Sequence, residues 1–294
     1  MDESKSPLFG IAPPCTPDQE YRRYTKLAPR GYYDPADERV KAVCVTNKWW
    51  KGISLIEPTT HVYTALLQTG ALNARSVVVL GAGFCGQIAG LLCKKLGVQR
   101  VTLIDIKEPR LEQAVGSGCA DAVEIEGTQM PGLNPDRHDP INALIKNTEG
   151  MYADVVFDAL PGLTPERSRD KQGTDGLAMT RNFGAQLLRP GGTWIMYSAS
   201  EYMQIPAVSW LAKGIEIHGA GYDSRLIGFP KRAAQMKAVL GLVEAGVIPL
   251  GDFVTKKRIA FSNEGAVTAA FQAYKTGGDL KIEICGERCP ADQG

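Results

Sequence analysis

The chain lacks several features that mark specialised classes of protein. Its 294 residues include only three histidines and 7% aromatic residues, and the formal net charge is +1. A balanced charge gives no broad attraction to nucleic acid or to an anionic membrane surface. No apolar run approaches the roughly 20 residues that span a bilayer. We therefore expect a small-molecule substrate, with neither nucleic acid nor membrane as a partner.

The cysteines and the first residues of the chain indicate the cellular compartment in which we expect the protein. Seven cysteines are scattered along the sequence, and residues 1–7 are polar, unlike the apolar core of a secretory signal peptide. An odd number of cysteines in a chain of this size favours free thiols, and we expect a cytoplasmic protein. Cys285 and Cys289 have no second pair with which to form a structural zinc site.

A glycine pattern beside an apolar run is the most informative stretch. Residues Val77–Leu80 lead directly into Gly81-Ala82-Gly83-Phe84-Cys85-Gly86, the pattern G-x-G-x-x-G, and a helical apolar pattern follows. In a strand–turn–helix unit, these glycines allow a tight turn, the approach of a pyrophosphate, and close packing of helix on strand. A second apolar run ends at Asp105, about 20 residues further on, where a carboxylate can bind ribose hydroxyls. The stretch predicts a dinucleotide site.

Apolar runs and helical patterns alternate along most of the chain. We expect strands at 77–80, 101–104, 123–125, 153–158, 193–197 and 215–220, and helices at 57–67, 110–114, 141–146, 177–188 and 233–245. This alternation predicts an α/β fold with a doubly wound, parallel, six-stranded Rossmann sheet. Beyond it we expect a strand at 253–259, a helix at 264–274 and a final strand at 280–284.

Four motifs resemble those of the medium-chain dehydrogenase/reductase superfamily, the group of the zinc-type alcohol and polyol dehydrogenases. They are Ile56-Glu57-Pro58 with residues 60–66, the 81–86 fingerprint, Leu188-Arg189-Pro190-Gly191-Gly192-Thr193, and Gly277-Gly278-Asp279-Leu280-Lys281-Ile282. The resemblance implies hydride transfer between a nicotinamide cofactor and an alcohol, polyol or ketone. It also implies pairing into a homodimer through the edge of the sixth strand.

The region before residue 56 departs from the superfamily, whose members carry a β-rich catalytic domain there. We therefore expect three parts: an N-terminal arm with a remnant of that domain (1–55), the dinucleotide-binding domain (56–246), and a C-terminal segment that returns to the remnant (247–294). The zinc-binding cysteine of the family and its Gly-His-Glu have no counterpart, and only Glu57 matches a zinc-site glutamate of polyol dehydrogenases. Because a zinc site needs three or four ligands, we predict no metal.

The predicted cofactor is NAD. The residues that we expect to bind it are Gly81, Gly83, Phe84, Cys85, Gly86, Asp105, Lys107, Arg110, Tyr197, Ser198, Ala220 and Lys281. The glycines and Asp105 follow from both the pattern and the resemblance, and the carboxylate favours NAD because it would repel the 2′-phosphate of NADP. Lys107 and Arg110 are nearby cations that weaken this preference. The positions after strands five and six, and Lys281, come from the resemblance.

Three residues of the 57–67 helix are candidates for catalysis. His61 falls where the family places a hydroxyl residue beside the nicotinamide, and an imidazole could accept the alcohol proton. A buried, hydrogen-bonded structural histidine is the alternative. Tyr63 is a proton relay or a packing residue. Glu57, one helical turn from His61, either orients the imidazole or is a favourable charge at a helix start.

Three functions fit this pattern. The first is a zinc-independent NAD(H)-dependent oxidoreductase. The second uses tightly bound NAD for a net non-redox reaction, such as epimerisation or elimination through a transient ketone. The third is a non-catalytic cofactor-binding subunit that serves another protein. The fingerprint favours an enzyme that binds NAD, and the substrate cannot be named from the residues.

Overall fold

The computed structural model describes ten stretches of the chain: residues 55–105, 107–125, 152–160, 176–197, 207–220, 229–253, 259–260, 262–276, 281–282 and 284–285. They fall into two compact units. The sheet unit comprises His61–Gly221 and Ala269–Lys281, and the second unit holds the other described residues. The predicted arm at 1–55 lies outside the described residues except for its last residue, so the division into three parts stays a prediction.

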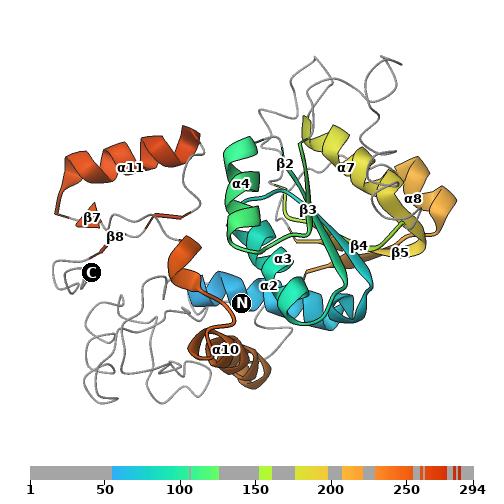
Figure 1. Cartoon of the computed structure of the whole chain (residues 1–294), viewed down its shortest axis with the longest axis horizontal. Helices are drawn as coiled ribbons and strands as arrows, with labels where there is room; N and C mark the ends of the chain where they lie inside the picture. Colours follow the sequence, from blue (N-terminus) through green and yellow to red (C-terminus); the bar gives the residue numbers. More distant parts are fainter. Residues whose placement is uncertain are drawn as a thin grey trace, which may run out of the picture. The chain divides into compact units, whose positions relative to one another are not determined.

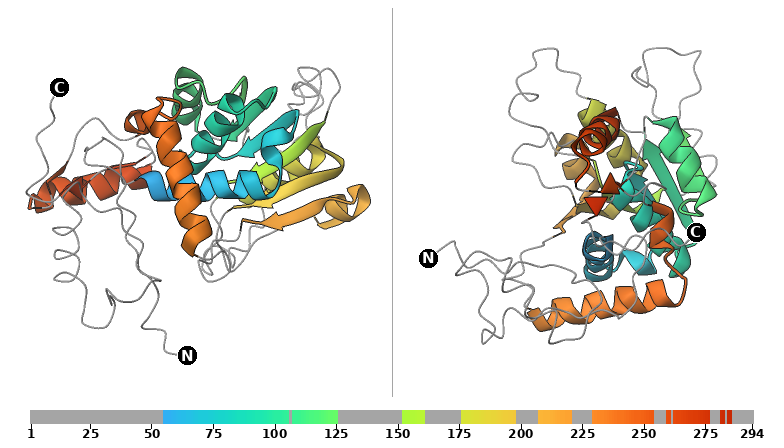
Figure 2. Two further views of the ribbon diagram at one scale, coloured as in Figure 1. Left: turned by 90° about the horizontal axis from the view of Figure 1, so that it is seen from below. Right: turned by 90° about the vertical axis from the view of Figure 1, so that its left-hand side faces the viewer.

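Six parallel strands form the sheet of the sheet unit, in the order β3-β2-β1-β4-β5-β6. The strands are β1 (Ser76–Leu80), β2 (Arg100–Asp105), β3 (Ala122–Ile125), β4 (Ala153–Asp158), β5 (Leu188–Met196) and β6 (Glu216–Gly219). Figure 2 shows them side by side in two further views. Strand β1 pairs with β2 on one side and with β4 on the other. The order reverses between β1 and β4, which makes their carboxyl ends the switch point where such folds bind ligands. The predicted doubly wound parallel fold is confirmed.

Two pairs of helices cover the sheet. Helices α3 (Phe84–Lys95) and α4 (Glu108–Gly116) pack on β1, β2 and β3, whereas α7 (Gly176–Leu187) and α8 (Ala207–Lys213) pack on β1, β4 and β5. Figure 1 shows the first pair on one side of the sheet and the second pair on the other. Every residue of β1 is buried, as expected of an apolar strand that is covered on both faces. Strand β1, which forms the switch point with β4, is therefore part of the core.

Tryptophans fill the space between the sheet and α8. Trp194 on β5 and Trp210 on α8 are both buried, and their ring centroids lie 5.0 Å apart. They share a core cluster with Leu80, Val156 and Leu188. Helix α8 was not predicted from the sequence, and Trp210 is the side chain by which it contributes to the core.

The start of β5 differs from the prediction. We expected Pro190 and the two following glycines to stop a helix before a strand at 193–197, yet β5 already begins at Leu188. Leu188 pairs with Ala153, and the register of the two strands then shifts. Gly191 has a φ of +64°, a conformation that suits glycine, and the Arg189 guanidinium donates to the carbonyls of the two residues that follow it. The segment is thus an irregular first part of the strand.

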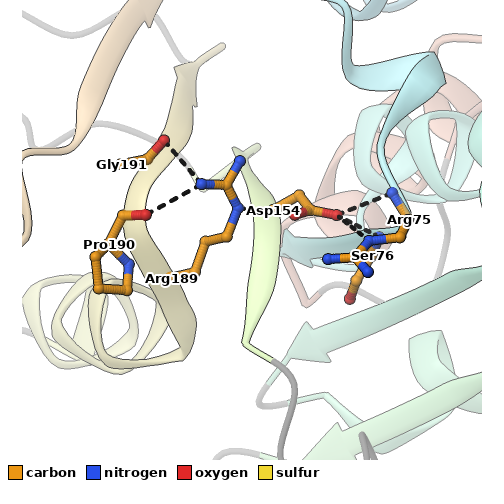
Figure 3. Close-up of polar contacts among 6 residues, drawn as sticks. All are labelled: Arg75, Ser76, Asp154, Arg189, Pro190 and Gly191. Atoms are coloured by element: carbon orange, nitrogen blue, oxygen red, sulfur yellow. Dashed lines mark hydrogen bonds and ion pairs between the residues drawn. The ribbon is translucent and has the colours of Figure 1, made fainter.

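One carboxylate joins three strands at the amino edge of the sheet. Asp154 accepts hydrogen bonds from the backbone N–H groups of Arg75 (2.9 Å) and Ser76 (3.2 Å) and from Nε of Arg189 (2.8 Å), as Figure 3 shows. Burial alone would raise the pKa of Asp154, but these hydrogen bonds outweigh it and hold the pKa below its ordinary value. The carboxylate is therefore charged at neutral pH.

The second unit contains α10 (Phe229–Glu244), a 3-10 helix at Leu250–Phe253, and a two-stranded parallel sheet of β7 (Ile259–Ala260) and β8 (Ile284–Cys285). Phe253 belongs to the 3-10 helix, so the strand predicted at 253–259 is wrong at its start, and residues 254–258 lie outside the described residues. Helices α2 (Ile56–Gln68) and α11 (Glu264–Thr276) each begin in this unit and end in the sheet unit. No described helix has the length and apolar character needed to cross a membrane.

Candidate functional site

The glycine turn between β1 and α3 is shaped by close backbone packing. A Cβ added to Gly86 would lie 1.8 Å from the carbonyl oxygen of Gly81, so only glycine fits at this position. Gly81 itself has a φ of +92°, in the region that favours glycine. At Gly83, by contrast, an added Cβ would come within 4 Å of only one atom of the described residues outside its chain neighbours, Nη1 of Arg110 at 3.9 Å. Among the described residues, this side of the turn is therefore uncrowded and lies beside a guanidinium.

Helix α3 begins in a way that suits an anion. Its N-cap residue is Gly83, no described side chain caps it, and the first helical bond runs from Gln87 N–H to the Gly83 carbonyl. The Nζ of Lys281 lies 5.7 Å from the centroid of the Phe84 ring. The lysine that we predicted to bind the pyrophosphate thus lies at the first turn of this helix. A helix start and a lysine together fit the charge of a diphosphate. Phe84 and Cys85 are the first two residues of the helix.

Asp105 is already part of the turn. Its Oδ2 accepts a hydrogen bond from Ala82 N–H at 2.6 Å, and its Oδ1 accepts one from Lys107 N–H at 2.8 Å. The residue is 8% exposed. Each carboxylate oxygen can accept a second hydrogen bond, so a ribose diol can still bind. The carboxylate thus holds the end of β2 against the glycine turn while it offers acceptors to a sugar.

Gln87 holds the turn in place, and it was not predicted from the sequence. Its side chain is fully buried, and Nε2 donates to the carbonyls of Ala82 (3.1 Å) and Arg110 (3.0 Å). The amide therefore ties the turn to α4, which carries Arg110. An amide within an otherwise apolar helix face, directly after the last glycine, is the signal that could have identified it.

Strands β5 and β6 supply further backbone at the carboxyl edge. Tyr197 N–H donates to the carbonyl of Asp158 at 3.1 Å, and Ala220 N–H donates to the carbonyl of Met196 at 2.8 Å. The Tyr197 ring packs on Phe157 with centroids 5.1 Å apart. These two predicted cofactor residues follow their strands at the edge where the glycine turn lies. Ser198 lies outside the described residues.

A buried ion pair stands at the end of β4 and was also missed. Nε of Arg181, on α7, donates to Oδ2 of Asp158 at 2.7 Å, and both side chains are fully buried. Oδ1 of Asp158 accepts a hydrogen bond from Leu160 N–H at 3.1 Å. Burial raises the pKa of Asp158, and the Arg181 guanidinium acts against that rise.

The three residues predicted for catalysis lie together on α2. Glu57, His61 and Tyr63 are all half-buried, and Glu57 and His61 are one helical turn apart. All three side chains thus have some access to solvent or to a ligand. Their chemical roles stay predictions.

Thiols and metal ligands give no second site in the described part of the chain. Cys85, Cys93 and Cys119 are free thiols. Burial raises the pKa of both Cys93 and Cys119 to about 12, so these two are thiols rather than thiolates at neutral pH. Among the described residues, no three His, Cys, Asp or Glu side chains are grouped to hold a metal ion.

Curated relatives of the chain are named as D-xylulose reductases. The chain is 26% identical over 235 residues to the probable D-xylulose reductase A of Emericella nidulans and 24% identical over 235 residues to the D-xylulose reductase A of Aspergillus oryzae. Each match covers 79% of this chain and 56% of the relative. The chain thus spans little more than half the length of these relatives. No model of a known protein family matches it.

Solved structures of dehydrogenases share the fold. L-idonate 5-dehydrogenase from Escherichia coli matches with a TM-score of 0.57 at 18% identity, over 80% of this chain and 56% of that one. A short chain alcohol dehydrogenase from E. coli CFT073, complexed with NADH, matches with a TM-score of 0.55 at 17% identity, over 78% of this chain and 57% of that one. TarJ of S. aureus, in complex with NADPH, matches with a TM-score of 0.58 at 15% identity, over 82% of this chain and 65% of that one.

The sequence matches and the fold agree with the motifs at 56–66, 81–86, 188–193 and 277–282. Together they bear out the predicted resemblance to the zinc-type alcohol and polyol dehydrogenases of the medium-chain superfamily.

Proposed function

We propose that the chain is a zinc-independent NAD(H)-dependent oxidoreductase that acts on an alcohol, a polyol or the corresponding ketone. The observation that carries the proposal is the glycine turn at the switch point of the sheet, with a carboxylate, a guanidinium and a lysine around it. The names of the curated relatives support a polyol or its ketose as the substrate class.

The choice of NAD over NADP rests on Asp105. Its carboxylate is held in place by two backbone N–H groups and can accept hydrogen bonds from the ribose hydroxyls, whereas a 2′-phosphate would be repelled. Arg110 and Lys107 reduce this repulsion. We expect NADH to bind more tightly than NADPH, and Asp105→Asn to narrow the difference. Equal affinity of the wild-type chain for both cofactors would contradict this assignment.

His61 is the proposed general base. When bound, the oxidised nicotinamide supplies the hydride acceptor. In alcohol oxidation the imidazole takes the hydroxyl proton as the carbinol C–H bond breaks, and in ketone reduction it returns that proton. Glu57, one helical turn away on α2, would orient the imidazole. Tyr63 would relay the proton toward solvent.

Turnover and binding test the proposal separately. We expect NADH to be consumed when D-xylulose or a related ketose is added, and His61→Ala to abolish this turnover while the Kd for NADH stays unchanged. Gln68→Ala, an exposed position at the end of the same helix, is the matched control and should leave turnover intact. Full activity in His61→Ala would exclude His61 as the base. NAD that stays bound through purification without net turnover would indicate the non-redox alternative.

A homodimer through β6 completes the proposal. Strand β6 is the edge of the sheet, and all four of its residues are exposed. Ile217 on this strand is 47% exposed, and Val208 and Leu211 on α8 are each 83% exposed, which is unusual for apolar side chains on a single subunit. Light scattering should give the mass of two chains, and Ile217→Lys should give that of one. A monomeric wild-type protein would contradict the dimer.

A further inference from the structure

The Asp158–Arg181 pair occupies the centre of the fold without a role in the proposed chemistry. Asp158 is the last residue of β4, directly beside Leu80 of β1 in the register of the sheet. Arg181 comes from α7, which packs on β1 and β4. Both side chains are fully buried, and their N–O distance is 2.7 Å.

The pair is linked to Gly81, the first glycine of the turn, through Leu160. The Asp158 carboxylate accepts the Leu160 N–H, and Cδ2 of Leu160 lies 3.3 Å from where a Cβ on Gly81 would be. Ala159, between them, donates its N–H to the Leu80 carbonyl at 3.0 Å. Residues 158–160 are therefore held against the turn by the Ala159 N–H and by one oxygen of the Asp158 carboxylate, while Arg181 donates to the other oxygen.

The same residue reaches β5. The backbone carbonyl of Asp158 accepts the N–H of Tyr197, the first residue after β5. Asp158 thus connects α7, the glycine turn and the carboxyl end of β5. These elements border the crevice between β1 and β4, where the dinucleotide of such folds crosses the sheet.

Stability alone does not account for a pair of this kind. The desolvation of two buried charges offsets most of their attraction, so an apolar pair of similar volume often serves a core equally well. What the ion pair adds is direction, because a charged hydrogen bond fixes the orientation of both groups. We propose that Asp158 and Arg181 are positioning residues for the dinucleotide, which hold residues 158–160 against Gly81 and keep the crevice in its binding shape.

The proposal rests on the proposed binding of NAD(H), and the titration of NADH into folded protein tests it. The double variant Asp158→Leu/Arg181→Met replaces the pair by apolar side chains. We expect its Tm to fall by about 2–12 °C, because the desolvation penalty of the charges is removed with their attraction but the buried Leu160 N–H loses its acceptor, at a cost of about 1–3 kcal/mol. Its Kd for NADH should rise by about tenfold, which corresponds to a loss of about 1.4 kcal/mol of binding free energy, because residues 158–160 are no longer held against Gly81 by a charged group.

A second Asp–Arg pair, which joins β4 to β5, provides the control. Arg189→Met removes the partner of Asp154 at the amino edge of β4 and β5, away from the glycine turn. This substitution should lower the Tm, because Asp154 loses its charged partner, and should leave the Kd for NADH unchanged. Arg181→Lys keeps the charge but not the guanidinium, and should raise the Kd for NADH in a protein that is still folded.

The outcomes separate the two proposals. If wild type binds NADH and the folded double variant binds it equally well, the pair has only a structural role and this inference is wrong, while the proposed function stands. If the double variant does not fold, an unchanged Kd in Arg181→Lys overturns the inference. If wild type binds neither NADH nor NADPH, the proposed function and this inference both fail.

Discussion

Gly86→Ala is the sharpest test of the glycine turn. The added Cβ would lie 1.8 Å from the carbonyl oxygen of Gly81, and real Cβ contacts are not closer than 3.0 Å, so the helix and the turn must separate by at least 1.2 Å (3.0 minus 1.8 Å). The clash is with backbone, which cannot rotate away as a side chain can. Overpacking of a core costs about 1–3 kcal/mol, and we expect the upper end of this range.

Both stability and cofactor affinity should fall. At roughly 2–4 °C per kcal/mol, a loss of about 3 kcal/mol lowers the Tm by about 6–12 °C. The same shift moves the start of α3 away from Gly81, and a displacement of about 1 Å can cost up to a hundredfold where groups must be positioned. Thermal denaturation measures the first effect. NADH titration at a temperature where the variant is folded measures the second.

Two other glycines give matched controls for Gly86→Ala. A Cβ on Gly90, one turn further along α3, would lie 2.3 Å from the Cys119 carbonyl oxygen, so Gly90→Ala should lower the Tm without a large change in NADH affinity. Gly116, the last residue of α4, has open space around it, and Gly116→Ala should stabilise the chain by about 0.5–1 kcal/mol. If Gly86→Ala binds NADH as tightly as wild type, the turn is not the pyrophosphate site.

Three further predictions follow from polar and thiol groups away from the turn. Because the folded pKa of Asp154 is lowered, its contribution to the free energy of unfolding is complete above about pH 4 and is lost as the pH falls through that pKa. The difference in Tm between wild type and Asp154→Asn should therefore disappear in acid. A difference that stays constant with pH would contradict this. Lys213 donates to three carbonyls at and just after the end of α7, and so caps this helix. In chemical denaturation, Lys213→Met should lower the free energy of unfolding by about 1–3 kcal/mol. An unchanged midpoint would show that Lys213 does not stabilise the helix end. Cys93 and Cys119, with pKa values raised to about 12 by burial, should react with a thiol reagent at pH 8 only after unfolding.

Local rules were sufficient to predict the turn and the succession of the strands along the chain. The spacing of Gly81, Gly83 and Gly86 after an apolar run specifies a strand–turn–helix unit, and the structure has that unit at those residues. Asp105 was expected at the end of the second strand, and β2 ends there. Each of these features depends on residues that are close in the sequence, and so the pattern alone predicts them.

Contacts between distant residues could not be predicted in the same way. Asp158 and Arg181 are 23 residues apart, and nothing in either local pattern indicates that they meet. The cap that Lys213 provides for α7 depends on how α8 packs on the sheet, which the sequence did not reveal. The early start of β5 depends on Arg189 and its partner on β4. In each case the tertiary fold, rather than local propensity, decides the outcome.

Strand β4 is anchored at both ends, and this has a consequence for how the protein opens. Asp154 fixes its amino end to β1 and β5, and Asp158 fixes its carboxyl end to α7. Sub-global opening follows the least anchored elements, so amide hydrogens of β1 and β4 should exchange with solvent last, and those of the exposed edge strand β6 first. The switch point at the carboxyl ends of β1 and β4 would then belong to the part of the sheet that outlasts every partial unfolding.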